Sequence, residues 1–283
     1  MTDIADKLVL VTGAASGIGR ATAALAAARG AQVVLTDLQP LDGTVAQIEA
    51  AGGRVALARS LDVTDYDAVL AFAKEVHDVH GSVDVVMNVA GISTWGTVSA
   101  LEHRHWRDLV EVNLMGPIHV IEAFVPAMVD AGRGGHLVNV SSAAGLIGMP
   151  WHAAYSASKF GLRGVSEVLR FDLRKHDIRV SLVCPGGVDT GLTETVTIAG
   201  VNKATPAFTK AHALFKRRAV SPERAAAAIL RGVRRNQYMV YTSPDIFAAY
   251  TLQRLFPPGY VAAMRVMNWG ANRVLPDVEK AHR

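Results

Sequence analysis

Three closely spaced glycines, Gly13, Gly17 and Gly19, lie between an apolar run at 7–11 and an alanine-rich segment at about 18–29. The apolar run is typical of a buried strand, and the segment after it has the composition of a helix. The first glycine allows a tight turn, the second lets backbone approach a phosphate, and the third permits close packing of helix on strand. The helix would begin with unpaired N–H groups and a partial positive charge. The segment therefore predicts a dinucleotide-binding strand, loop and helix.

Similar apolar runs recur along the chain, and most intervals between them carry helical patterns. They lie at about 7–12, 32–36, 54–61, 83–89, 135–141, 178–184 and 238–242. This alternation predicts a parallel sheet with helices on both faces, because strands buried on both faces are apolar nearly throughout. We expect an α/β Rossmann-type fold with a doubly wound parallel sheet of seven strands. The 283 residues are expected to form a single domain, since no repeat or low-complexity linker divides them.

A second group of residues is formed by Ser142, Tyr155 and Lys159. Tyr155 and Lys159 are four residues apart in a stretch with helical periodicity at 153–174, so they should share a helix face. A phenol with a pKa of about 10 is a poor proton donor or acceptor at neutral pH, and a nearby ammonium lowers that pKa. Ser142 ends an apolar run thirteen residues before Tyr155, from where its hydroxyl could bind a substrate oxygen. Together with the glycine loop, this spacing favours general acid–base chemistry over a chance pattern on a helix.

With these motifs, the chain resembles the short-chain dehydrogenase/reductase family from about Asp6 to Thr242. The resemblance is carried by five motifs in family order: the loop Thr12 to Gly19, the strand end Asn88-Val89-Ala90-Gly91, with valine where asparagine is more usual, then Asn113, then Ser142 with Tyr155 and Lys159, and finally Pro185 to Thr190.

The resemblance implies an NAD(P)-dependent oxidoreductase in which the cofactor carries the hydride chemistry and the protein supplies orientation and electrostatics. Tyr155 would exchange a proton with the substrate oxygen, which Ser142 would orient. Lys159 would hold the nicotinamide ribose and lower the pKa of the phenol, and Asn113 would support a water that relays protons. The implied cofactor-binding residues are Gly13, Ser16, Gly17, Ile18, Gly19, Asp37, Asp62, Val63, Asn88, Ala90, Gly91, Tyr155, Lys159, Pro185, Gly186, Val188 and Thr190.

The end of the second predicted strand indicates which nicotinamide cofactor is bound. Asp37 follows Gly19 by eighteen residues, where a carboxylate accepts hydrogen bonds from the adenosine ribose and repels a 2′-phosphate. Neither Ser16 nor Leu38 supplies the cation that such a phosphate would need. We therefore expect NAD rather than NADP. Asp62 and Val63, at the end of the third strand, resemble the family's adenine contact.

Segment 191–220 is expected to fold over the substrate as a lid, as the equivalent segment does in the family. Residues that could line the pocket, or else pack in the core or on the surface, are Trp95, Met149, Trp151, His152, Val188 and Leu192. His152 is expected to be a solvated loop residue. The apolar pocket favours a hydrophobic secondary alcohol or ketone such as a steroid, retinoid or lipid-like molecule.

Two other functions are open. An NADPH-dependent 3-oxoacyl reductase acting on carrier-bound or CoA-bound chains is disfavoured by Asp37. A cofactor-binding sensor or scaffold without turnover is disfavoured by the intact Asn113, Ser142, Tyr155 and Lys159.

Charge is distributed unevenly along the chain. Residues 201–283 contain 14 basic and 4 acidic residues, whereas residues 1–200 contain 15 and 21. The basic part includes an extension at 243–283 that is rich in aromatic residues and methionine but has no apolar run long enough to span a membrane. It could cover the substrate mouth, contact another subunit of a dimer or tetramer, or contact a membrane surface. No nucleic-acid recognition motif accompanies the basic residues.

The remaining signals are few. The single Cys184 cannot form an internal disulfide, and its place in an apolar run favours a packing role. Asp3 and Asp6 precede the first strand, so no signal peptide is expected and a cytoplasmic location is the default. The ten histidines show no metal-ligand spacing, and no metal site is expected.

Overall fold

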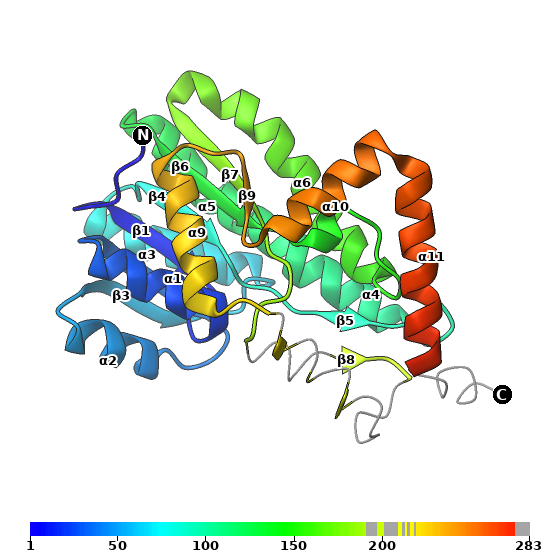
Figure 1. Cartoon of the computed structure of the whole chain (residues 1–283). Coiled ribbons are helices and arrows are strands. Elements are labelled where there is room, and N and C mark those ends of the chain that lie inside the picture. The colour runs from blue at the N-terminus through cyan, green and yellow to red at the C-terminus, as the bar shows by residue number, and fades with distance from the viewer. Residues whose placement is uncertain (191–196, 201–208, 211–212, 214–215, 218, 275–283) are drawn as a thin grey trace.

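The computed structural model describes residues 1–190, 197–200, 209–210, 213, 216–217 and 219–274. Its centre is a parallel seven-stranded sheet in the order β3-β2-β1-β4-β6-β7-β9 (Figure 1). The strands are β1 (Leu8–Thr12), β2 (Gln32–Asp37), β3 (Arg54–Ser60), β4 (Val85–Asn88), β6 (Gly135–Val140), β7 (Ile178–Cys184) and β9 (Met239–Tyr241). Each predicted apolar run supplies one of these strands, and the predicted Rossmann-type fold is confirmed.

The strand order reverses beside β1. Val9 of β1 lies opposite Val33 of β2 on one side and opposite Val85 of β4 on the other. The chain connections therefore run in opposite directions from β1, and in such sheets a crevice opens at the carboxyl ends of the strands where the order reverses. The loops that follow β1, β4, β6 and β7 meet at this edge.

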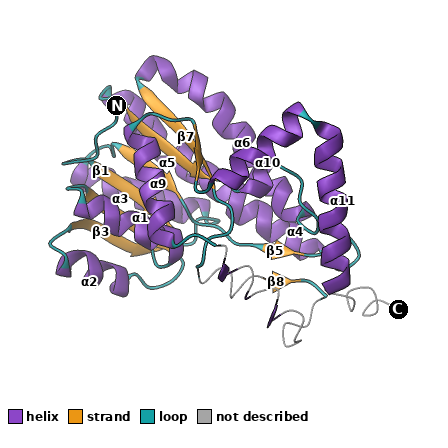
Figure 2. Ribbon diagram, viewed as in Figure 1, coloured by secondary structure: helices purple, strands orange, loops and turns teal. Residues whose placement is uncertain are grey.

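Helices cover both faces of the sheet (Figure 2). On one face α1 (Gly17–Ala28) packs against α9 (Pro222–Arg234), with α2 (Asp42–Ala50) beside them. On the other face lie α3 (Tyr66–His80), α5 (Gly116–Ala131) and α6 (Ala153–Asp172). The sheet is therefore doubly wound, as predicted.

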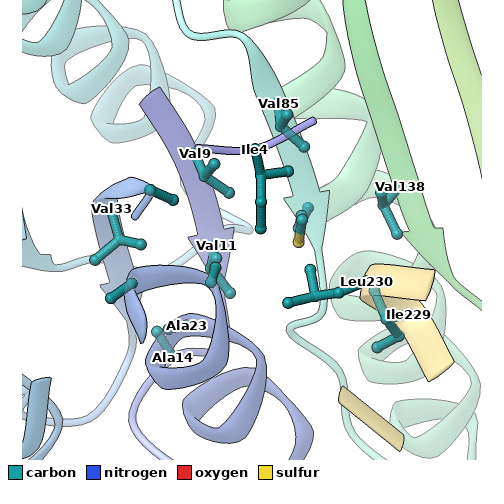
Figure 3. Close-up of a cluster of buried hydrophobic side chains, with 14 of the residues drawn as sticks. Ile4, Val9, Val11, Ala14, Ala23, Val33, Val85, Val138, Ile229 and Leu230 are labelled. Atoms are coloured by element: carbon teal, nitrogen blue, oxygen red, sulfur yellow. The ribbon is translucent and has the colours of Figure 1, made fainter. Parts of the chain in front are cut away.

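The two core clusters follow the alternation of side chains along β1. Val9 and Val11 are fully buried and face α1 and α9, in the cluster that Figure 3 shows. Leu8 and Leu10 point the other way, into the cluster that includes Phe124 of α5. Successive strand residues point to opposite faces, so a strand covered on both sides must be apolar at every position.

Short local signals set the helix ends. The Asp65 side chain accepts a hydrogen bond from the backbone N–H of Ala68 at 3.0 Å and caps α3, which Gly81 ends with a φ of 74°. Ser221 caps α9 by accepting from the N–H of Arg224, and Pro222 occupies the first helical position, where no N–H is needed.

The helix that leads into α5 contains a π-helical turn. It begins as α4 (His103–Val110), passes through η1 (Glu111–Met115) and continues as α5, with buried Asn113 inside the turn. Such turns are frequent at functional sites. By length and composition this continuous helix could cross a membrane, but Phe124 and Met128 are buried in the core.

The remaining elements lie near the carboxyl edge of the sheet. A short parallel pair joins β5 (Thr94–Trp95) to β8 (Thr197–Ile198), and the single turns η2 (Ala143–Gly145) and η3 (Leu173–His176) flank α6. The extension from residue 243 forms α10 (Pro244–Leu255) and α11 (Pro257–Val274), which turn back toward β5 in Figure 1. Most of segment 191–220, including Leu192, and residues 275–283 lie outside the described residues.

Candidate active site

The glycine loop after β1 has a shape that only glycine accommodates. Gly13 has a φ of +69° and Gly17 a φ of +52°, a region that other residues rarely adopt. A Cβ on Gly13 would lie 2.7 Å from backbone atoms of Ala90, and one on Gly19 would lie 1.9 Å from the carbonyl oxygen of Gly13. The loop thus packs its backbone closely against the end of β4.

The start of α1 can receive an anion. Its N-cap residue, Ser16, makes no side-chain capping hydrogen bond, and the first turn carries no acidic residue. A Cβ on Gly17 would lie 3.1 Å from the Thr190 side chain, so the loop after β7 closes over this helix start. Ile18 packs with Val188 in the same place. Backbone N–H groups and the positive end of the helix dipole fit a pyrophosphate here.

Both carboxylate oxygens of Asp37 accept backbone hydrogen bonds, one of them from the glycine loop. Oδ2 accepts from the Ala15 N–H at 2.8 Å, and Oδ1 accepts from the Gln39 N–H at 2.9 Å. Each oxygen keeps a further lone pair for a ribose hydroxyl. Arg20, which the sequence analysis did not consider, donates to the carbonyl oxygen of Ala15 and to Thr44 Oγ1. A guanidinium therefore lies close to the ribose position.

The predicted adenine contacts lie after β3. Asp62 is exposed, and its Oδ1 accepts from the Thr64 N–H at 2.9 Å and from the Thr64 hydroxyl at 2.8 Å. Val63 is buried, and its carbonyl oxygen accepts from His119 Nδ1 at 2.9 Å. These hydrogen bonds shape the turn that follows β3.

The end of β4 forms the floor of the crevice. Thr12 Oγ1 accepts from the N–H groups of Val89 and Ala90 at 3.0 and 3.1 Å, which joins β4 to the glycine loop. Behind it, Asn88 Nδ2 donates to Asn139 Oδ1 at 2.9 Å, and Asn139 in turn donates to Ser166 Oγ on α6. This buried chain of amides connects the cofactor side of the sheet with the helix that carries Tyr155 and Lys159.

Asn113 is fixed by its amide group against the backbone after Gly91. Its Oδ1 accepts from the Ile92 N–H and its Nδ2 donates to the Ile92 carbonyl oxygen, both at 2.9 Å. Nδ2 also lies 3.2 Å from Ser158 Oγ, a contact that the sequence analysis did not identify. A Cβ on Gly91 would lie 2.9 Å from Asn113 Oδ1 and 3.3 Å from Lys159 Nζ. Gly91 is therefore where Asn113 and Lys159 meet.

Lys159 is buried and has its ammonium group directed at β6. Its Nζ donates to the Val140 carbonyl oxygen at 3.0 Å and lies 5.9 Å from the centroid of the Tyr155 ring. Burial lowers the pKa of Lys159 to about 8. A low-dielectric environment disfavours the ammonium form, so this lysine is easier to deprotonate than one in water.

Tyr155 and Ser142 lie together, but the phenol is not acidified. Burial raises the pKa of Tyr155, and its hydrogen bond with Ser142 offsets only part of that rise. Ser142 Oγ also accepts from the Ala144 N–H at 3.1 Å, which holds the hydroxyl beside the phenol. The low phenol pKa expected from the sequence is therefore not found in this structure, because desolvation of the phenolate is the largest influence on it.

The segment from Pro185 to Thr190 closes the nicotinamide end. The Pro185 carbonyl oxygen accepts from the Ala143 N–H at 2.7 Å, which places this loop beside Ser142. The Gly186 N–H donates to Thr242 Oγ1 at 3.3 Å, and buried Val188 forms a parallel bridge with Val220. These contacts connect the loop after β7 to the ends of β6 and β9, at the place predicted to bind the carboxamide.

One wall next to Tyr155 is aromatic. The His152 ring lies 4.5 Å from the Trp95 ring and 6.2 Å from the Tyr155 ring, measured between centroids. His152 is a loop residue as predicted, but it is half-buried between these rings rather than fully solvated, and this burial lowers its pKa. Trp151 and Met149 precede it in the same loop and are half-buried.

The residues present fit a nicotinamide dinucleotide. The glycine backbone could receive the phosphates and Asp37 a ribose hydroxyl. Lys159, Tyr155 and the loop after β7 could hold the nicotinamide end. Within the described part of the chain, no group of three His, Cys, Asp or Glu residues could hold a metal ion.

Comparisons with known proteins agree with this geometry. The family model for short chain dehydrogenases matches residues 7–199. An oxidoreductase of Mycobacterium tuberculosis, SadH, is 36% identical over 267 residues, which cover 92% of this chain and 94% of SadH. The trans-4-hydroxycyclohexanecarboxylate dehydrogenase of Sinomonas cyclohexanicum is 40% identical over 197 residues, covering 67% of this chain and 75% of that enzyme.

Two solved structures are similar over most of the chain. A short chain dehydrogenase/reductase of Burkholderia phymatum in complex with NAD is 29% identical with a TM-score of 0.79, covering 90% of this chain and 95% of that one. A metagenomic short-chain oxidoreductase in complex with NADP is 34% identical with a TM-score of 0.66, covering 85% and 97%. From this agreement of sequence, fold and crevice, the chain belongs to the short-chain dehydrogenase/reductase family of nicotinamide-dependent oxidoreductases.

Proposed function

We propose that the protein is an NAD-dependent dehydrogenase that interconverts a hydrophobic secondary alcohol and its ketone, with Tyr155 as general acid and base. The observation that carries the proposal is the convergence of four side chains at one end of the crevice. Ser142 is hydrogen-bonded to the Tyr155 phenol, while Lys159 and Asn113 meet at Gly91 behind it.

Each side chain has a distinct task in proton transfer. Ser142 binds the substrate oxygen and orients it toward the phenol. Tyr155 takes the hydroxyl proton during oxidation and returns it during reduction. Lys159 supplies the positive charge that favours the phenolate once the substrate is bound, and Asn113 keeps the path behind it hydrated. The nicotinamide supplies or accepts the hydride when it is bound.

NAD is the proposed cofactor because Asp37 presents two carboxylate oxygens at the ribose position. A 2′-phosphate there would face a carboxylate that is held in place by the Ala15 and Gln39 N–H groups. Arg20 is the nearby cation, and its guanidinium is already engaged by Ala15 and Thr44. A fluorescence titration of the protein with NADH and NADPH tests this directly. Tighter binding of NADPH would overturn the assignment and revive the 3-oxoacyl reductase alternative.

The apolar substrate follows from the side chains around Tyr155. Trp95 packs against His152, which in turn packs against Tyr155, and Met149 and Trp151 precede His152 in the same loop. The segment 191–220 is proposed as the lid that completes this pocket, and the extension 243–283 as the outer support of its wall. We further propose a cytoplasmic homo-oligomer, with contact of the basic C-terminal part to an anionic membrane surface as the alternative use of that part.

Replacing Tyr155 by phenylalanine tests the catalytic assignment. We expect Tyr155→Phe to lower kcat by about 10²-fold or more, the loss typical of general acid–base catalysis, while the Kd for NADH changes little. The measurement is nicotinamide absorbance with a panel of secondary alcohols and ketones, and Tyr66→Phe on the exposed side of α3 is the control. Turnover near the original rate in Tyr155→Phe would refute the mechanism, and a dead original protein across the panel would favour the sensor interpretation.

A further inference from the structure

His152 occupies the N-cap position of α6 but does not cap the helix. N-cap side chains usually accept a hydrogen bond from the first turn, which is why serine, threonine, aspartate and asparagine are preferred there. The His152 side chain makes no such bond. Its Nδ1 instead lies 2.7 Å from the carbonyl oxygen of Pro150. The ring is therefore oriented by Pro150 and not by the first turn of α6.

The Pro150 contact decides which ring nitrogen carries the proton. A carbonyl oxygen can only accept, so Nδ1 must be the N–H donor, and Nε2 of a neutral ring is then a hydrogen-bond acceptor. Burial lowers the pKa of His152 and so favours the neutral ring. Nε2 makes no hydrogen bond with any described residue. The described part of the chain does not bury this atom completely, so another molecule can reach it. The ring that packs edge-on against Tyr155 thus carries an acceptor without a partner among the described residues.

The surroundings fix the imidazole in place. Trp95 lies against the ring at 4.5 Å between centroids, and its own Nε1 donates to Ser93 Oγ at 2.7 Å. Trp151, immediately before His152, adopts a φ of +68°, which is unfavourable for a bulky residue. Its carbonyl oxygen accepts from the Gly96 N–H at 2.8 Å, and its Nε1 donates to Asn272 Oδ1 at 3.2 Å. Backbone strain of this kind persists where the surroundings enforce it, commonly at active sites.

We propose that His152 Nε2 is a substrate-recognition acceptor that binds a second hydroxyl of the substrate, near the carbon that Tyr155 acts on. The inference rests on the proposed function for the place of the reacting carbon. The His152 and Tyr155 rings are 6.2 Å apart between centroids, so two oxygens of one small molecule can reach both side chains. Vicinal and 1,3-diols, and the hydroxyketones derived from them, have such oxygens.

The chemistry of Nε2 also sets what this position rejects. A lone pair repels a carboxylate oxygen, so a substrate acid group has no place beside a neutral His152. A substrate that lacks any group there leaves the acceptor without a partner once water is excluded. A site built to bind a hydroxyl therefore discriminates against analogues without it. The side chain acts on substrate choice, whereas proton transfer stays with Tyr155.

The test compares the binding of trans-1,2-cyclohexanediol and cyclohexanol to the NADH-loaded protein by isothermal titration calorimetry. Binding does not require turnover, so failure of the proposed catalytic mechanism and failure of this inference can be told apart. We expect the original protein to bind the diol about tenfold more tightly, the factor that corresponds to roughly 1.4 kcal/mol for one hydrogen bond.

Three substitutions separate the acceptor from the shape of the ring. His152→Phe keeps an aromatic ring against Trp95 but removes both nitrogens. His152→Asn can still donate to Pro150 but has no group at the Nε2 position, and His152→Gln places an amide oxygen near that position. The acceptor role would be supported if His152→Phe and His152→Asn lost the preference for the diol and His152→Gln kept it. Equal binding of the two alcohols by the original protein, or an undiminished diol preference in Asn and Phe, would overturn it.

Discussion

Lys159 combines burial with a single strong hydrogen bond, and this has a consequence for stability that is independent of catalysis. Burial lowers its pKa from 10.5 to about 8, whereas an unfolded chain would keep the ordinary value. Between these pH values the unfolded state binds the proton and the folded state does not. The free energy of unfolding therefore rises with pH through this range, by roughly 3 kcal/mol for the whole shift.

Comparison with Lys159→Met isolates this contribution. We compare the unfolding free energy of the original protein with that of Lys159→Met. The original protein should gain stability relative to the variant from about pH 8 to pH 10.5, because its buried Lys159 loses its charge in the folded state over this range. Urea unfolding followed by circular dichroism at several pH values measures it. Lys175→Met, which removes an exposed lysine of the same region, is the matched control. A difference that stays flat over this range would contradict the lowered pKa.

Some residue-level properties could be predicted from the sequence and others could not. Spacing was sufficient to expect Tyr155 and Lys159 on one helix face, because a helix fixes the relation of residues four apart. The pKa of Tyr155 and the position of His152 depend on desolvation and on rings from distant segments, such as Trp95. Sequence spacing carries no information about such contacts. Ser158 was missed for the same reason, although its place one residue before Lys159 was visible.

At the scale of elements, the end of β2 is where we propose that the choice between NAD and NADP is made. Asp37→Ala with Leu38→Arg removes the carboxylate and adds a cation at a position that is 64% exposed. The preference should move from NAD toward NADP, because a cation attracts the 2′-phosphate that Asp37 repels. The ratio of kcat/KM for the two cofactors measures the change, and Asp42→Ala on α2 serves as the control. An unchanged ratio would mean that the ribose does not lie against Asp37.

The helix α11 supports the loop before α6 through two side-chain hydrogen bonds. Tyr260 Oη donates to the Gly148 carbonyl oxygen at 2.7 Å, and Asn272 accepts from Trp151 Nε1. Removing both with Tyr260→Phe and Asn272→Ala should raise KM for the alcohol about threefold to tenfold, since each bond contributes on the order of 1 kcal/mol. KM for NAD should stay the same. Asn268→Ala, on the exposed side of the same helix, should change neither constant.

The elements differ in how well their sequences specify them. The strands of the main sheet are buried on both faces, and a continuous apolar run signals each of them. The two-residue strands β5 and β8 have no such signal, since residues 94 and 197 come together only in the fold. The helix α10 ends just before Pro257, which begins α11, since a proline cannot continue a helix. The position of α11 against the rest of the fold depends on contacts with Gly148 and Trp151, which the local sequence does not predict.

At the scale of the whole molecule, the outer face of α10 and α11 remains apolar. Leu255 and Val266 are 79% and 69% exposed, and Phe256 and Val261 are exposed beside them in sequence. Several exposed apolar side chains on two neighbouring helices are what a contact site for another molecule would offer. A neighbouring subunit is the proposed partner. Deleting the whole extension would be a poor test, because Ile246 is buried against Gly186 and belongs to the core.

Point substitutions on the exposed face test the partner instead. Leu255→Glu with Val266→Glu should reduce the molecular mass measured by light scattering, because charges are costly in an apolar interface. Val79→Glu, at a 70% exposed valine of α3, is the control. An unchanged mass together with lost binding to anionic liposomes would indicate that this face contacts a membrane surface and not a neighbouring subunit. Unchanged mass and unchanged liposome binding would contradict both uses of this face.

The reversal of strand order beside β1 also governs when the crevice can exist during folding. β1 lies between strands that begin at residues 32 and 85, and the loop that closes the nicotinamide end follows β7, which ends at residue 184. Contacts between such distant segments form late, because long chain loops must close first. A chain emerging from the ribosome therefore possesses its phosphate-binding glycines long before it possesses the rest of the crevice. The crevice that would bind a nicotinamide is therefore expected to be completed late in folding.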